Sequence, residues 1–150
     1  MNTAKIVSIN ISSTKGVRKT PIPQGELHPD QGLVGDAHAG KWHRQLSLLA
    51  QESIDTMRAK GFDVNPGDFA ENITTQGLTL HTLPVGTRLW LGEVQAEVTQ
   101  IGKECHSGCA IRKLTGDCVM PREGIFVRVL NPGTVRPGDV VALAEDDQGS

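Results

Sequence analysis

Frequent glycines and prolines cut this chain into short segments. The 150 residues include seventeen glycines and eight prolines, and most stretches between them are rich in Val, Ile, Leu and Thr. Glycine and proline interrupt regular structure and form turns, whereas β-branched residues favour strands. The regular alternation of strands and helices that marks a parallel sheet is not visible. The pattern therefore predicts a mainly β domain with one or two helices, and it favours a β-barrel decorated by helices.

Six segments have the composition of strands. Two of them, 87–91 and 94–100, flank Gly92 and Glu93 and predict a hairpin with a two-residue turn. The other strands are predicted at 5–11, 44–49, 125–130 and 140–143. We expect a loop over 12–25 and a turn at 131–133, where Asn, Pro and Gly follow one another.

Helical patterns are few in this sequence. Segment 51–60 is predicted to be a helix, because its apolar residues recur at helical spacing and Gly61 follows at the position of a C-cap. A second short helix is predicted around 109–114. If that helix began near Cys105, its side chain and that of Cys109 would lie on one face, one turn apart.

Length and charge limit the class of protein. We expect one domain over 1–145 and a flexible acidic tail at 146–150. The first residues lack a basic start followed by a long apolar run, and three cysteines cannot all pair, so we expect a cytoplasmic protein without a disulfide framework. Apolar stretches are far shorter than the roughly 20 residues of a membrane span. A formal net charge of −2 and the absence of Tyr argue against nucleic-acid binding.

The three cysteines lie close together in the sequence, at Cys105, Cys109 and Cys118. A thiol acts as a nucleophile or a metal ligand only as the thiolate, which nearby positive charge favours. Cys105 lies beside Lys103 and His106, so it is the first candidate for a reactive group. The alternative is that the cysteines are small buried apolar residues.

A structural zinc site would need four ligands, and the nearest candidates are Cys105, His106, Cys109 and Cys118. Structural zinc usually binds two pairs of ligands, whereas Cys118 stands alone here, and adjacent Cys and His residues rarely bind one ion together. His38 and His43 are five residues apart and lack the i, i+4 spacing of a catalytic zinc helix. The spacing therefore disfavours zinc.

A second polar cluster lies in segment 32–44, which contains three glycines. Its candidate ligand-binding side chains are Asp36, His38, Lys41, His43 and Arg44. Glycine lets backbone amides approach a ligand closely, and Lys and Arg suit phosphate or another oxyanion. The alternative is a glycine-rich surface loop with solvated charges. The segment matches neither the phosphate-binding loop of nucleotide-binding proteins nor a dinucleotide motif.

Several stretches in order resemble the MOSC domain family, which is named after the C-terminal domain of molybdenum-cofactor sulfurases. They are GLVGDAHAGKWHRQLSLL, PGDFAENITTQGL and LPVGTRLWLGEVQAEVTQIGKEC. The final stretch, GDCVMPREGIFVRVLNPGTVRPGDVV, is similar to the small stand-alone bacterial members of the family. The resemblance covers about nine-tenths of the chain and implies a MOSC-type β-barrel.

The resemblance also implies a role for Cys105. Family members bind the molybdenum cofactor, molybdopterin with its metal, or carry sulfur as a persulfide, through a cysteine after the strand that corresponds to 94–100. Here that cysteine is Cys105, which would accept sulfur or coordinate the metal, and Cys109 or Cys118 could resolve the adduct as a disulfide. Many members have Pro-Arg or Arg-x-Pro before this cysteine, whereas this chain has Ile-Gly-Lys-Glu, so Lys103 would supply the local cation.

Other residues would bind the cofactor. The phosphate of molybdopterin would be held by Lys41, His43, Arg44 and Arg122. Asn72, in the stretch PGDFAEN, also matches the family pattern, and the alternative for it is a structural hydrogen bond to the backbone.

Partners and alternative functions follow from the same resemblance. No segment resembles a pyridoxal-phosphate-dependent desulfurase, so we expect no pyridoxal phosphate here, and a persulfide would come from a separate cysteine desulfurase. Molybdopterin-biosynthesis proteins are the other expected partners. Two further functions stay open: a module that binds the cofactor or a protein without covalent chemistry, and a molybdenum-dependent reductase of N-hydroxylated compounds. Whether the protein is an enzyme is therefore open.

Overall fold

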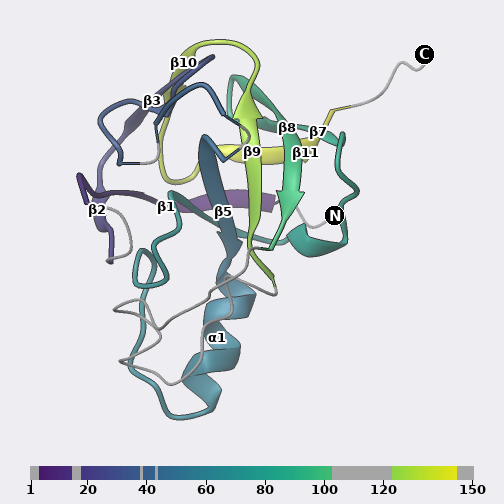
Figure 1. Ribbon diagram of the computed structural model, residues 1–150. Coiled ribbons are helices and arrows are strands. Elements are labelled where there is room, and N and C mark those ends of the chain that lie inside the picture. Colours follow the sequence, from purple (N-terminus) through teal and green to yellow (C-terminus); the bar gives the residue numbers. More distant parts are fainter. Residues whose placement is uncertain (1–3, 15–17, 38, 43, 103–122, 145–150) are drawn as a thin grey trace.

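The computed structural model describes residues 4–14, 18–37, 39–42, 44–102 and 123–144 (Figure 1). Its elements in chain order are β1 (Ala4–Ile11), β2 (Thr20–Ile22), β3 (Gly25–His28), β4 (Gly32–Leu33), β5 (Leu46–Ala50), α1 (Gln51–Ala59), β6 (Ile73–Gln76), the 3-10 helix η1 (Leu80–Thr82), β7 (Arg88–Leu91), β8 (Val94–Ile101), β9 (Ile125–Val129), β10 (Gly133–Val135) and β11 (Val140–Leu143). No helix among the described residues is long and apolar enough to cross a membrane.

Seven of the described strands form a closed barrel (Figure 1). Strands β11, β7, β8, β9 and β5 are antiparallel neighbours in that order, and β6 pairs with β5 in parallel. Strand β1 pairs with both β6 and β11 and so closes the barrel. Strand β2 pairs with β1 on the outside, and β10, β3 and β4 form a separate small sheet. The prediction of a mainly β protein with a barrel is confirmed.

Alternate side chains of the strands fill the barrel. In β7, Leu89 and Leu91 are buried, whereas Arg88 and Trp90 point outward, as expected for a strand with one face on the core. The predicted hairpin joins β7 to β8, and Gly92 in its turn has a φ of 62°, in the left-handed region that glycine adopts readily.

A second apolar cluster lies between α1 and the barrel. The predicted helix is confirmed at Gln51–Ala59, directly after β5. It packs through Ile54 and Met57 in one cluster with Leu49 of β5 and Phe126 of β9. The second predicted helix, around 109–114, lies outside the described residues.

Several short strands were not predicted. The expected loop 12–25 contains β2 and the start of β3, and the expected turn at 131–133 ends where β10 begins. Strand β6, with the sequence ITTQ, was also missed. Strands of two or three residues, such as β2 and β10, are too short to show a clear alternation, and pairing with distant partners stabilises them more than their own composition does.

Candidate functional site

The segment that contains all three cysteines connects β8 to β9. The two strands pair up to Ile101 and Ile125, and the backbone N–H of Gly102 donates to the carbonyl of Gly124 at 2.7 Å. The described residues on either side of segment 103–122 therefore meet at one end of the β8–β9 pair. The candidate residues outside the described part of the chain are His38, His43, Lys103, Cys105, His106, Cys109, Cys118 and Arg122.

Arg44 lies at the end of β8, and the start of the cysteine segment follows β8 in the sequence. Its Nε donates to Oε1 of Gln100 at 3.1 Å, and its guanidinium carbon is 5.4 Å from the ring centre of Phe126, within the range of a cation–π contact. The amide of Gln100 donates in turn to the carbonyl of Gly102 at 2.8 Å. Arg44 is thus fixed to the end of the strand that leads into the cysteine segment.

A β-bulge shapes this end of β8. The register shifts between Val98 and Gln100, so that Thr99 is the additional residue, and its hydroxyl donates to the carbonyl of Phe126 at 3.1 Å. Bulges occur often beside functional sites, where they turn a side chain to a new direction. Here Gln100, directly after the bulge, is the residue that holds Arg44.

Asp36, a second candidate ligand, lies in the interior. Its carboxylate accepts a hydrogen bond from Nζ of Lys19 at 2.8 Å and another from the backbone N–H of Ser12 at 3.1 Å. Both side chains of the ion pair are fully buried. Buried charges are stable only when they are paired and hydrogen-bonded, so this pair joins the segment around Asp36 to the chain before β2.

Asn72 lies in a network that we call the polar seam, which consists of Ser8, Asn10, Ser47, Glu71, Asn72 and Thr74. Oδ1 of Asn72 accepts hydrogen bonds from the backbone N–H and the hydroxyl of Ser47, at 3.0 and 3.2 Å. Nδ2 of Asn72 donates to the carbonyl of Asn10 at 3.4 Å. The side chain therefore connects β5 with β1, and its polar atoms are used within the protein.

Glu71 is the charged member of the polar seam. Oε2 accepts hydrogen bonds from the backbone N–H of Gly67 at 2.9 Å and from the hydroxyl of Thr74 at 2.7 Å, whereas Oε1 makes none among the described residues. Complete burial raises the pKa of Glu71, because the charged form loses its hydration, and the hydrogen bonds offset only part of this effect.

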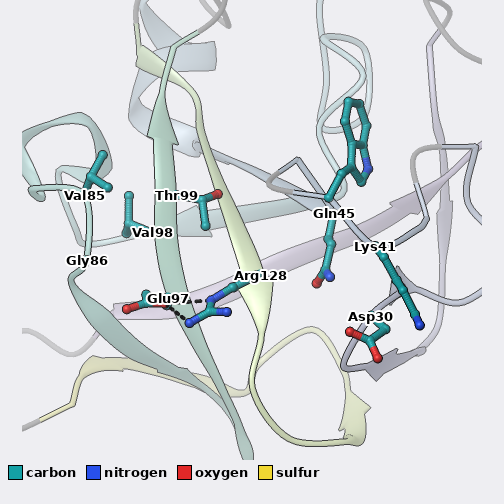
Figure 2. A pocket seen from close by; sticks show the side chains of 10 residues that line it. Asp30, Lys41, Gln45, Val85, Gly86, Glu97, Val98, Thr99 and Arg128 are labelled. Atoms are coloured by element: carbon teal, nitrogen blue, oxygen red, sulfur yellow. Dashed lines mark hydrogen bonds and ion pairs between the residues drawn. The ribbon is translucent and has the colours of Figure 1, made fainter.

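Lys41 lies elsewhere, at a cavity on the outer side of the barrel that we call the outer cavity. The cavity has a volume of about 590 Å³. Figure 2 shows Glu97 and Arg128 on one side of it and Gln45, Lys41 and Asp30 on the other. Lys41 and Arg44, which the sequence placed together at one phosphate, thus have different neighbours in the described part of the chain.

Sequence reasoning missed most of the outer cavity. Arg128 carried a weak signal, since it is a charged residue within the apolar strand IFVRV, and Trp42 was an aromatic residue among glycines and charges. Nothing in the sequence marked Gln45, because its place in the cavity depends on a contact with the distant backbone of Val129.

Comparisons with known proteins give one family match and several similar solved structures. A model of the MOSC domain family matches residues 35–142. The crystal structure of the YuaD protein from Bacillus subtilis is similar with a TM-score of 0.78 and 19% identity, covering 95% of this chain and 96% of that chain. YiiM from Geobacillus stearothermophilus is similar with a TM-score of 0.74 and 25% identity, covering 97% of this chain and 77% of that chain.

YiiM from Escherichia coli is also similar, with a TM-score of 0.67 and 21% identity over 97% of this chain and 71% of that chain. The structures that are less than 25% identical support the fold alone. No match is found among curated proteins.

Proposed function

The chain belongs to the MOSC domain family, whose members are associated with the molybdenum cofactor, and we propose that it binds this cofactor or carries sulfur for it through Cys105. The observation that carries the proposal is the position of Arg44 on Gln100, at the end of β8. The chain passes from there through Gly102 to Cys105, three residues later.

The donor groups at this place fit an anionic cofactor. Among the described residues, Arg44 makes hydrogen bonds only through Nε, so its two Nη atoms can donate to a phosphate. The ring of Phe126 and the amide of Gln100 restrict the guanidinium to one orientation. Arg122, two residues before Gly124, and Lys103, one residue after Gly102, would add positive charge. When bound, the cofactor would supply a metal centre for redox or sulfur chemistry.

Asp36 and Asn72 fit such a role less well. The carboxylate of Asp36 is buried against Lys19, and the amide of Asn72 is bonded to Ser47 and Asn10. We therefore propose that these two residues support the site through the fold, and that Arg44 contacts the cofactor itself.

Sulfur transfer to Cys105 needs no additional redox partner. The Cys105 thiolate would attack the outer sulfur of a persulfide on a cysteine desulfurase, which forms a new S–S bond on Cys105 and breaks the S–S bond of the desulfurase. The desulfurase leaves with its own cysteine as a thiolate, so no electrons are gained or lost overall. The positive charge of Arg44 near the entry of this segment would favour the thiolate.

Mass spectrometry tests both forms of the proposal. The wild type and the Cys105→Ser variant are mixed with molybdopterin released from a donor enzyme and measured under native conditions, with Cys118→Ser as the matched control. We expect binding by the wild type and the control, and loss of binding in Cys105→Ser. Equal binding by all three would indicate a module that holds the cofactor without the thiol.

A second measurement examines sulfur transfer alone. After incubation with a cysteine desulfurase and cysteine, the wild type is expected to gain the mass of one sulfur atom on the peptide that contains Cys105. Absence of that mass, together with absence of cofactor binding, would refute the proposed function.

A further inference from the structure

The outer cavity contains hydrogen-bond donors that the protein does not use. Oε1 of Gln45 accepts from the backbone N–H of Val129 at 2.9 Å, which fixes the amide so that Nε2 points the other way. Gln45 is only 5% exposed, and Nε2 makes no hydrogen bond within the described part of the chain. The ammonium group of Lys41, on the same side of the cavity in Figure 2, has no ion pair among the described residues either.

The opposite side of the cavity contributes one more donor. Arg128 donates from Nε and Nη2 to the same oxygen of Glu97, at 2.7 and 2.6 Å (Figure 2). This leaves Nη1 without a partner in the described residues. The second oxygen of Glu97 lies 3.9 Å from Nε of Arg88, an ion-pair distance that is too long for a hydrogen bond.

The groups at the cavity are therefore mostly donors. Among the described lining residues, three donors remain, on Gln45, Lys41 and Arg128, against two carboxylate acceptors, the exposed group of Asp30 and Oε2 of Glu97. A ligand that satisfies them must offer acceptor oxygens, and charge-assisted hydrogen bonds from Lys and Arg favour an oxyanion.

The apolar groups of the cavity suit a flat ring. Trp42 lines the cavity and is 38% exposed, and Val85, which also lines it, is 62% exposed. An aromatic ring can stack on an indole, and aliphatic side chains can cover its edge. The volume of about 590 Å³ is within the range of roughly 300–1,000 Å³ that is usual for small-molecule sites.

From these contacts we infer that the outer cavity binds a planar aromatic ring that carries a phosphate or carboxylate group. The ring lies against Trp42, and the oxyanion accepts hydrogen bonds from Lys41, Nε2 of Gln45 and Nη1 of Arg128. This site requires neither Cys105 nor the molybdenum cofactor, so it can be tested independently of the proposed function.

Tryptophan fluorescence tests the site with defined probes. The chain has two tryptophans, and the Trp90→Phe variant leaves Trp42 as the single reporter. Adenosine 5′-monophosphate and nicotinate serve as the anionic probes, and adenosine and nicotinamide serve as their uncharged counterparts. We expect at least one anionic probe to change the fluorescence of Trp42 to saturation, with an affinity at least about tenfold above that of its uncharged counterpart.

Two substitutions in the Trp90→Phe background locate the binding. Lys41→Gln is expected to weaken binding of the anionic probe about tenfold, and Lys41→Arg to retain most of it. Lys5→Gln, an exposed lysine on β1, removes the same charge elsewhere and is expected to leave the affinity unchanged. The inference is overturned if neither anionic probe saturates, if the uncharged counterparts bind equally well, or if Lys41→Gln and Lys5→Gln behave alike.

Discussion

The polar seam and the outer cavity both contain buried side-chain amides, but in opposite situations. In the seam, the amide of Asn10 accepts from Ser8 at 2.6 Å and donates to the carbonyl of Glu71 and the hydroxyl of Thr74, at 3.1 and 3.2 Å. At the cavity, Gln45 uses only one end of its amide within the described residues. A polar group with protein partners at both ends stabilises the fold, whereas a fixed group with a free donor is available to a ligand.

The buried ion pair gives the largest expected effect. Asp36→Asn would remove the carboxylate that faces the buried ammonium of Lys19 at 2.8 Å, and we expect it to lower the free energy of unfolding by about 3–5 kcal/mol. Lys41→Gln removes a charge from the same loop at an exposed position and should change stability by less than about 0.5 kcal/mol. Urea denaturation measures the free energy of unfolding of both variants. Equal decreases in the two variants would mean that the buried ion pair stabilises the fold no more than an exposed charge does.

Two glycines with positive φ, one beside the polar seam and one at the outer cavity, allow a second comparison of these regions. Gly67 has a φ of 91°, and a Cβ there would overlap with the carbonyl oxygen of Lys19. Gly86, at the outer cavity, has a φ of 98° and open space around it. We expect Gly67→Ala to cost about 3 kcal/mol, from strain and overlap together, and Gly86→Ala to cost about 1 kcal/mol from strain alone. Thermal and urea unfolding provide both values, and a smaller loss at Gly67 would contradict the packing described for the seam.

The sequence predicted the barrel well where strands were long enough to alternate. Strands β7 and β8 and their turn were correct to within a residue, because local pattern and turn chemistry agree there. Strands β2, β4 and β10 were missed, since two or three residues carry no clear period and are stabilised by distant partners.

For the candidate site, the residue types predicted polar chemistry, but they did not predict which partner each side chain contacts. Asp36, Lys41 and Arg44 lie within nine residues of one another in the sequence and looked like one anion site. In the structure Asp36 is buried with Lys19, Lys41 lines the outer cavity and Arg44 is bound to Gln100. These separate positions depend on contacts with residues 17 to 56 positions away in the chain, which a local pattern does not contain.

The carboxyl of Glu71 gives the seam a pH dependence. Its raised pKa means that the folded protein retains a proton that the unfolded chain releases near the ordinary value of 4.5. Below that pH both states are protonated and the contribution to stability is fully present; it is lost as the pH rises from 4.5 through the pKa of the folded state.

Glu71→Gln isolates this effect, because it keeps an acceptor for Gly67 and Thr74 and is uncharged at every pH. The stability of the variant relative to the wild type should therefore rise between about pH 4 and pH 7. Urea denaturation at about pH 4, 5.5 and 7 measures this difference. A difference that stays constant or falls over this range would show that burial does not control the titration of Glu71.

A small effect on stability is expected at Arg128, where fold and binding should separate most clearly. Its ion pair with Glu97 joins two neighbouring strands, but the Arg128 side chain is 51% exposed, so water screens the interaction. We expect Arg128→Gln to lower the free energy of unfolding by less than about 1 kcal/mol. The same substitution should weaken binding of an anionic aromatic probe at the outer cavity about tenfold, because it removes a charged donor.

Arg88→Gln is the matched control: it removes an arginine from the same carboxylate, but Arg88 does not line the cavity. If both variants reduced binding equally, the general charge of the barrel surface, rather than the fixed donor on Arg128, would be the cause.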